Sequence, residues 1–357
     1  MKKVIGLIIL VLIIGGVVIY QKFSNNTNVI TLKGPIGGEK KEFLDNPKIK
    51  EILRKKYGLI IDYSKAGSIE MVQGIIQEDV DFLWPSSQVA LELFKMRTDV
   101  KHLKDEIIFN SPIVLYSWDK VTDALITQKF VEKRADTYFV PGFNKLIELI
   151  NNDAKWSDIG ITQLYGKIQI FSTDPSKSNS GNAFSGLVAN ILAGDVITDL
   201  TLDKHLHSIE MFFIKQGYME HSSGDLFDQY LRTGMGAKPI IAGYESQIIE
   251  FSKKYSESWP GLKDKVKILY PEPTVWSSHP IIIIKEKAKV LSEALKDKDI
   301  QKIAWEEHGF RTGLFGVQND PGKLVIDGIP PTIEKVIPMP QAKVMDSIIK
   351  SINNKNN

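Results

Sequence analysis

A repeated alternation of strand, loop and helix is the feature that most limits what this chain can fold into. Three short runs rich in β-branched and aromatic residues begin at Val29, Leu59 and Val80, and each leads into a loop of small or polar residues. An amphipathic stretch with helical spacing follows each loop. Such an alternation predicts right-handed βαβ units that share a parallel sheet.

A second series of similar segments fills the rest of the chain. Strands are expected at 111–116, 167–171 and 239–243, and the very apolar run 279–284 predicts a strand that is buried on both faces. A last helix is expected at about 341–352. Since 357 residues suffice for two cores, we predict an α/β protein of two lobes.

The composition excludes several classes of function. The 45 basic and 43 acidic residues give a net charge of +2, which provides no electrostatic footprint for nucleic acid. The absence of cysteine excludes disulfides, thiolate metal sites, a cysteine nucleophile and a lipid-modified cysteine anchor. The six histidines lack metal-ligand spacing, and no dinucleotide or phosphate-loop motif is present. We therefore expect no metal, no cofactor and no nucleic-acid partner.

The N-terminus predicts the compartment. Lys2 and Lys3 precede an uncharged run from Val4 to Tyr20, which as a helix would be about 25 Å long, near the lower limit for crossing a bilayer. A cleaved signal peptide is the alternative, but 17–21 offers no small residues for cleavage. We expect residues 1–23 to be an uncleaved signal anchor that crosses the cell membrane once, residues 24–28 a linker, and the folded part extracellular or periplasmic.

Small polar residues gather where the predicted strands end and helices begin. In open α/β sheets ligands bind at this edge, and free N–H groups at helix starts suit anions or carboxylates. Helix capping by the same residues is the alternative interpretation of any single loop. The candidate ligand-contacting residues are Gly37, Gly38, Glu39, Gly67, Ser68, Ser86, Ser87, Ser111, Thr173, Asn179, Ser180, Gly181, Asn182, Tyr244 and Glu245.

No catalytic centre stands out. Ser180 lies in Asn-Ser-Gly, which is not the nucleophile elbow of hydrolases. His221 precedes Ser222 and Ser223, but adjacency in sequence is not triad geometry, and turn chemistry explains it. We therefore predict a protein that is not an enzyme, with a serine hydrolase using Ser180 or Ser222 as the less favoured alternative.

Together these segments resemble a known family. The first strand–loop–helix unit, the loop 172–182, the helix start Tyr244-Glu245-Ser246 and the Trp-Glu-Glu-His-Gly-Phe run at 305–310 are similar to type 2 periplasmic binding proteins. The branch is that of extracellular solute-binding proteins related to the phosphate and molybdate receptors. The resemblance covers about Val29 to Leu314.

The resemblance implies an architecture. The chain would cross between two lobes near 110–112 and again near 274–278, with a hinge there and a ligand cleft between the lobes. Lobe 1 would then comprise residues 29–110 and 278–352, and so contain both ends of the folded part, while lobe 2 would comprise residues 111–277.

The resemblance also implies a function, namely capture of a small solute for an ABC-type importer with a permease partner. A sensor or assembly protein with the same fold is the alternative. The chain departs from the phosphate receptors in lacking their serine-glycine-threonine loop and a lipid-attachment cysteine. Lysines in or near the loops favour an anionic ligand; they are Lys33, Lys40, Lys65 and Lys177. Glu39, Asp174 and Glu245 would disfavour a fully charged anion, or would bind a proton or amine of the ligand.

Overall fold

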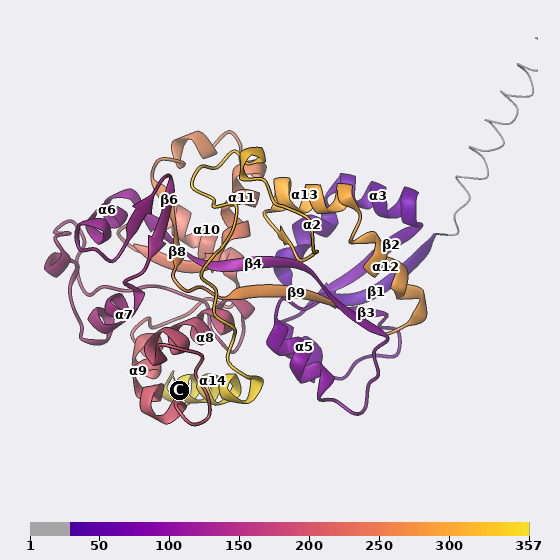
Figure 1. The fold of residues 1–357 in the computed structure, drawn as a ribbon, viewed down its shortest axis with the longest axis horizontal. Helices are drawn as coiled ribbons and strands as arrows, with labels where there is room; N and C mark the ends of the chain where they lie inside the picture. The colour runs from indigo at the N-terminus through magenta and orange to yellow at the C-terminus, as the bar shows by residue number, and fades with distance from the viewer. Residues whose placement is uncertain (1–28, 357) are drawn as a thin grey trace, which may run out of the picture.

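Two lobes joined by a pair of long strands make up residues 29–356, the part of the chain that the computed structural model describes (Figure 1). Strands β4 (Lys104–Trp118) and β9 (Trp276–Ile283) run antiparallel from one lobe into the other, with Asn110 opposite Ser278. The two strands pass between the lobes near Asn110 and Ser278.

The sheet of lobe 1 is mixed rather than purely parallel. Strands β1 (Ile30–Ile36) and β2 (Leu59–Lys65) pair in parallel, and the Trp84 N–H donates to the Pro35 carbonyl at 3.0 Å beside β3 (Phe82–Leu83). Strands β3, β9 and β4 then pair antiparallel. The expectation of a parallel sheet is therefore correct only for the first strands, because the strands that join the lobes pass through lobe 1 in opposite directions.

Helices cover both faces of this sheet. Phe82, Ile281 and Ile283 contribute to one core, whereas Leu83 and Ile282 contribute to the other, as the two-residue period of a strand requires. The prediction that this apolar strand is buried on both faces is confirmed. On the first face lie α2 (Lys41–Asp45), α3 (Pro47–Tyr57), α12 (Lys289–Ala294) and α13 (Lys298–His308); on the second lie α4 (Ser68–Gln73) and α5 (Gln88–Lys95).

Lobe 2 is built around the second half of β4. Its sheet contains β7 (Ile240–Tyr244), β4, β8 (Val266–Pro271), β6 (Thr137–Val140) and β5 (Glu132–Arg134), and only β6 and β8 pair in parallel. The expected strand at 167–171 is limited to single bridges at Lys167 and Phe171. The helices are α6 (Asp119–Thr127), α7 (Phe143–Asn151), α8 (Asn179–Ala193), α9 (Leu202–Ile214), α10 (Ser223–Thr233) and α11 (Glu245–Lys254). Short 3-10 turns lie at Gly38–Lys40, Trp156–Ile159, Trp259–Gly261, Glu286–Ala288 and Pro321–Lys323.

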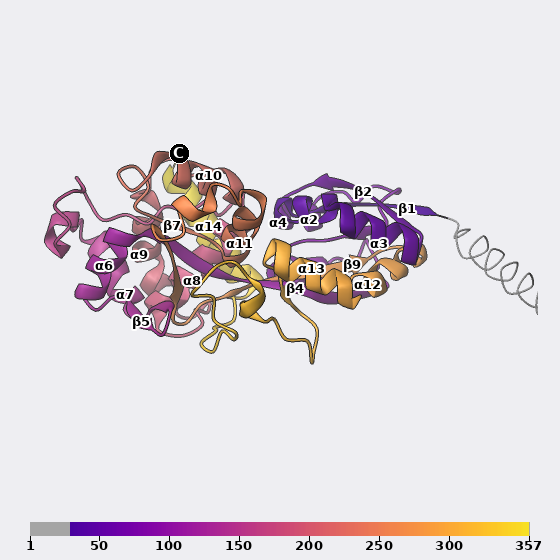
Figure 2. The ribbon, with the colours of Figure 1, turned by 90° about the horizontal axis from the view of Figure 1, so that it is seen from above.

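The C-terminal segment returns to lobe 2, which departs from the expected domain boundaries. After β10 (Arg311–Thr312) an extended strap, residues 313–341, passes Thr274, whose N–H donates to the Lys335 carbonyl at 3.0 Å. Helix α14 (Ala342–Asn356) then packs on α8 and α9, and its buried Met345 and Ile348 belong to the lobe 2 core. Residues 342–352 were expected in lobe 1; their apolar face instead completes lobe 2, so the chain crosses between the lobes a third time (Figures 1 and 2).

The predicted signal anchor and linker, residues 1–28, lie outside the described residues. Within residues 29–356, none of the helices combines the length and the apolar character needed to span a bilayer.

Candidate functional site

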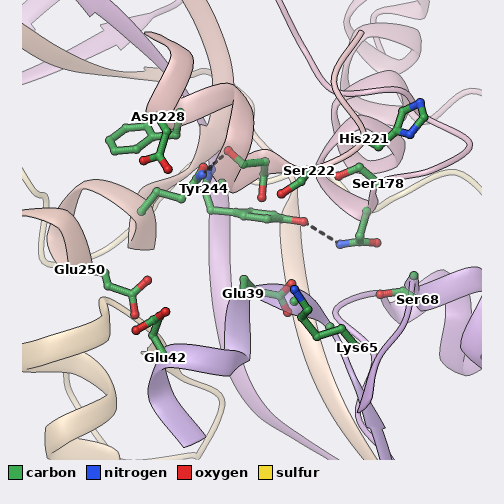
Figure 3. Close-up of a pocket in the computed structure, with 18 of the residues that line it drawn as sticks. Glu39, Glu42, Lys65, Ser68, Ser178, His221, Ser222, Asp228, Tyr244 and Glu250 are labelled. Atoms are coloured by element: carbon green, nitrogen blue, oxygen red, sulfur yellow. Dashed lines mark hydrogen bonds between the residues drawn. The ribbon is translucent and has the colours of Figure 1, made fainter. Parts of the chain in front are cut away.

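A cavity of about 490 Å³ lies between the lobes, and residues of both lobes line it (Figure 3). Lobe 1 contributes the loop after β1 with the start of α2, and the loop after β2 with α4. Lobe 2 contributes the start of α8, the start of α10 and one face of α11. Most of these segments are strand-to-helix loops, the kind of position at which the sequence analysis expected a ligand to bind.

A buried lysine organises the lobe 1 side of the cavity. Lys40 is fully buried, and its Nζ lies 2.5 Å from both Glu39 Oε1 and Ser86 Oγ and 3.1 Å from His279 Nδ1. Ser86 also donates a hydrogen bond to Glu39. Gly37 makes this arrangement possible, since a Cβ there would fall 2.5 Å from Glu39 Oε1. The Glu39 carboxylate is thus fixed at the cavity wall by groups behind it.

The same contacts shift the pKa values of this cluster. Burial would raise the pKa of the Glu39 carboxyl, but Lys40 and the hydrogen bond to His279 together outweigh burial and hold that pKa well below its usual range. Burial lowers the pKa of Lys40, an effect that Glu39 opposes. Burial, aided by the charge of Lys40, lowers the pKa of His279 to about 4. At neutral pH the cavity therefore presents an ionised Glu39 backed by a neutral His279.

We expect the protein to lose stability in mild acid through His279. Because its pKa is about 4 when folded and about 6.5 when unfolded, the unfolded chain takes up a proton first as the pH falls below 6.5. The free energy of unfolding should fall by about 2 kcal/mol between pH 7 and pH 5 from this group. Glu39, whose pKa is also lowered, adds a loss in the same direction below about pH 4.5.

Urea unfolding at both pH values measures this effect, with His279→Gln as the comparison. The variant should show a smaller difference between pH 7 and pH 5 than the native protein, whatever its absolute stability. Equal differences in the two proteins would show that His279 does not carry the effect.

Asn179, the first residue of α8, ties the lobes together at the back of the cavity. Its Nδ2 lies 2.6 Å from the Ser86 carbonyl, 3.0 Å from Tyr244 Oη and 3.2 Å from Ser277 Oγ. Burial raises the pKa of the Tyr244 hydroxyl, which therefore stays neutral where it accepts from Asn179.

One face of α11 lines the cavity, which the sequence reasoning missed. Gln247, Glu250, Phe251 and Lys254 are spaced by three or four residues and so lie on one side of the helix. Lys254 Nζ lies 3.4 Å from Glu42 Oε2 of lobe 1. The helix begins in a loop that was predicted to contact the ligand. The spacing of these four residues on one side of that helix could therefore have indicated that they line the cavity.

The start of α10 also lines the cavity, although its sequence had been interpreted as turn chemistry only. The lining residues are His221, Ser222, Ser223, Gly224, Phe227 and Asp228. Ser222 caps α10, its Oγ accepting from the Asp225 N–H at 3.4 Å, so the interpretation as a turn is correct but incomplete.

The predicted site residues divide into two groups. Those that line the cavity are Gly37, Gly38, Glu39, Gly67, Ser68, Asn179 and Tyr244. Those that do not are Ser86, Ser87, Ser111, Thr173, Ser180, Gly181, Asn182 and Glu245. Ser86 nevertheless contacts the lining residue Glu39 directly.

The second group has structural roles that explain its composition. Ser87 caps α5 through the Ala90 N–H at 3.2 Å, and Ser180 Oγ lies 2.7 Å from Thr173 Oγ1. Gly181 is packed so closely under the Thr173 carbonyl that a Cβ could not be placed there without a clash. The loop 178–182 therefore owes its small residues largely to internal packing, and only its first part reaches the cavity.

Glu245 is fully buried and does not face the cavity, contrary to expectation. Arg311 binds it with both nitrogens, Nε at 2.6 Å and Nη2 at 2.8 Å, and Tyr270 Oη donates to it at 2.7 Å. Arg311 also donates to the carbonyls of Pro330 and Pro331 in the strap. Glu245 thus holds the junction of the lobes together, and its charge is satisfied internally.

The structure is similar to solved structures of binding proteins, whereas no family model and no curated protein sequence matches the chain. An extracellular solute-binding protein from Bordetella parapertussis matches with a TM-score of 0.58 at 12% identity, over 91% of this chain and 98% of that one. The substrate-binding protein of an ABC transporter from Agrobacterium tumefaciens matches with a TM-score of 0.58 at 13% identity, over 93% of this chain and 96% of that one. Iron-bound HitA from Pseudomonas aeruginosa matches with a TM-score of 0.55 at 13% identity, over 90% of this chain and 99% of that one.

At these identities the likeness concerns the fold, and it extends over nearly the whole of each matched protein. The two lobes, the paired strands that join them and the cavity between them agree with that likeness. The chain has the two-lobed α/β fold of type 2 periplasmic solute-binding proteins.

Proposed function

We propose that this protein captures a small solute in the cavity between its lobes and presents it to the permease of an ABC-type importer. The observation that carries the proposal is a 490 Å³ cavity lined by both lobes, because a ligand there would contact both and favour their closure. The similarity to the ABC transporter protein of Agrobacterium tumefaciens supports the transport role.

We include an anionic group of the ligand in this proposal. Lys65 and Lys177 line the cavity together with the start of α8 at Asn179, and free N–H groups at such a position favour negative charge. The lining also carries carboxylates, Glu42 and Glu250 among them, so a purely anionic ligand does not account for the whole cavity.

Closure on ligand is the expected result that tests the function. A thermal-shift screen of small anions, amino acids and sugars would first identify a compound that binds. Small-angle scattering should then show a smaller radius of gyration at saturating ligand, because β4 and β9 allow the lobes to move as units. Lys65→Gln should weaken binding, whereas Lys55→Gln, an exposed lysine of α3 outside the cavity, should not. An unchanged radius with a saturating ligand would contradict the proposal.

The N-terminal segment is proposed to hold the protein on the outer side of the cell membrane. The support is the uncharged run 4–20, the two lysines before it and the absence of small residues for cleavage at 17–21. Mass spectrometry of the membrane fraction should find the intact N-terminus. A mature N-terminus near Ser24 in a soluble fraction would contradict the anchor without affecting the binding function.

The hydrolase alternative gains no support from the geometry. Ser180 Oγ is engaged by Thr173 and Ser178, and Ser222 caps a helix. No hydrogen bond within residues 29–356 joins either serine to a histidine. We therefore propose a binding protein rather than an enzyme.

A further inference from the structure

We propose that the solute is zwitterionic, with an acidic group bound at one end of the cavity and an amine or quaternary ammonium at the other. This inference rests on the proposed binding function and specifies its ligand class. It is carried by the difference between the two ends of the cavity: Ser68, Ser178 and His221 lie toward one end in Figure 3, whereas Glu42 and Glu250 lie at the other.

The first end suits an acidic group. Lys177 precedes Ser178 and Asn179, and its carbonyl lies 3.6 Å from the position of a Cβ on Gly67. The loops of the two lobes therefore meet here. The Glu70 carboxylate also lies here and accepts the Gly67 N–H at 3.4 Å, so the acidic group of the ligand must be held by the two lysines and the hydroxyls. Within residues 29–356 neither Lys65 nor Lys177 forms a salt bridge, so both ammonium groups are available to a ligand. Hydroxyls of Ser68, Ser178 and Ser222 would add hydrogen-bond donors.

The second end suits a cation. Glu42 of lobe 1 and Glu250 of lobe 2 point toward one another across the cavity (Figure 3). Asp228 of α10 also lines the cavity, on the same side of Figure 3 but apart from this pair, and in the described part of the chain no salt bridge engages it. Facing carboxylates repel each other unless a positive charge lies between them. An ammonium group there would remove the repulsion and bring the lobes together.

Aromatic rings complete this end. The rings of Phe251 and Tyr255 are 4.9 Å apart, those of Phe227 and Phe251 are 6.0 Å apart, and all three residues line the cavity. Aromatic faces beside carboxylates bind organic cations by cation–π attraction, whereas they offer little to a hydrated inorganic anion. Lys254 Nζ already lies over the Tyr255 ring, 5.7 Å from its centroid, which shows that this end accommodates a cation.

Groups of the protein itself already contact both carboxylates. Lys254 reaches Glu42 at 3.4 Å from a half-exposed position, and such a pair in solvent is weak. His308 lies 2.7 Å from Glu250. In the middle of the cavity Glu39 is already paired with Lys40. A ligand ammonium can therefore replace Lys254, and Asp228 remains as an additional acceptor of its charge.

Matched probes test the inference on the full folded chain. ω-Amino carboxylates of increasing chain length, from β-alanine to 6-aminohexanoate, and phosphocholine carry both charges. Propionate and phosphate carry only the negative charge, and propylamine and choline only the positive one. Isothermal titration should give measurable binding for at least one zwitterion, and binding at least about tenfold weaker for each of its single-charge analogues.

Variants assign the ends of the cavity. Asp228→Asn, which removes no internal salt bridge, should weaken the binding zwitterion about tenfold, and Glu250→Gln should weaken it further. Lys65→Gln should weaken the same probe from the other end. Glu51→Gln, on the exposed surface of α3, is the matched control and should leave affinity unchanged.

The outcomes separate this inference from the function on which it rests. Tight binding of phosphate, or of another solute without an amine, would overturn the zwitterion and leave the solute-binding function intact. A zwitterion that binds with no loss in Asp228→Asn and Glu250→Gln would also overturn the assigned cation end. If neither the zwitterions nor any compound of the broader screen binds, both proposals are rejected.

Discussion

Replacing Arg311 by methionine should cost about 3–5 kcal/mol of the free energy of unfolding, the range for breaking a buried ion pair from one side. The substitution leaves the Glu245 carboxylate fully buried with Tyr270 as its remaining donor. It also removes the hydrogen bonds that hold the strap at Pro330 and Pro331. Chemical denaturation of the full chain measures the loss.

A surface arginine provides the control. Arg134 binds Glu132 and Glu272 but is 43% exposed, so Arg134→Met should cost no more than about 1 kcal/mol. Adding Glu245→Gln to Arg311→Met should restore part of the lost stability, because no unpaired charge is then buried. An Arg311→Met protein within 1 kcal/mol of the native one would contradict this account of the pair.

Gly181→Ala should destabilise the protein by about 2–3 kcal/mol, although alanine is normally the better helix former. Its Cβ would overlap the Thr173 carbonyl oxygen and the backbone of Asp174, neither of which is a flexible side-chain end. Helix α8 would have to move away from the loop 172–178. Gly181→Asp should be worse, since it places a larger side chain in the same space.

Gly224→Ala is the matched control, because Gly224 also lies in the first turn of a helix. The nearest atom to a Cβ there is Ser222 Oγ at 3.6 Å, an ordinary contact. Alanine should therefore leave stability unchanged or raise it by about 0.5–1 kcal/mol. Thermal or urea unfolding compares the two variants, and equal effects would show that the close approach at Gly181 is not what requires glycine.

Local features of this protein could be predicted well from its sequence. The strands at Val29 and Leu59 and the doubly buried strand at Ile281 follow from short-range patterns of apolar residues. The loops at Gly38 and Ser68 also lie where strand ends predict a ligand site. These features depend on neighbouring residues and on one general rule of α/β sheets.

Features that depend on distant partners could not be predicted. The buried Glu245 belongs with Arg311, and nothing in the sequence around Tyr244 indicates that an arginine lies behind the loop. Gly181 was predicted to contact the ligand, but close packing of the backbone requires glycine just as close approach of a ligand does. The carboxylates at Glu42 and Glu250 become neighbours only when the lobes face each other. Helix α14 has an amphipathic pattern that would suit either lobe.

The third crossing of the chain sets the order in which the protein can be completed during synthesis. The lobe 1 core combines Leu32 and Phe43 with Ile281 and Leu291, and lobe 2 needs Ile348 from α14. At ribosomal rates the first segment waits on the order of ten seconds for β9 and α12 to emerge. The lobe 1 core is incomplete until β9 and α12 have been made, and the lobe 2 core is incomplete until α14 has been made. A polypeptide stopped before Trp276 would therefore expose apolar surface from both lobes, and lobe 2 has its complete core only once α14 has been made.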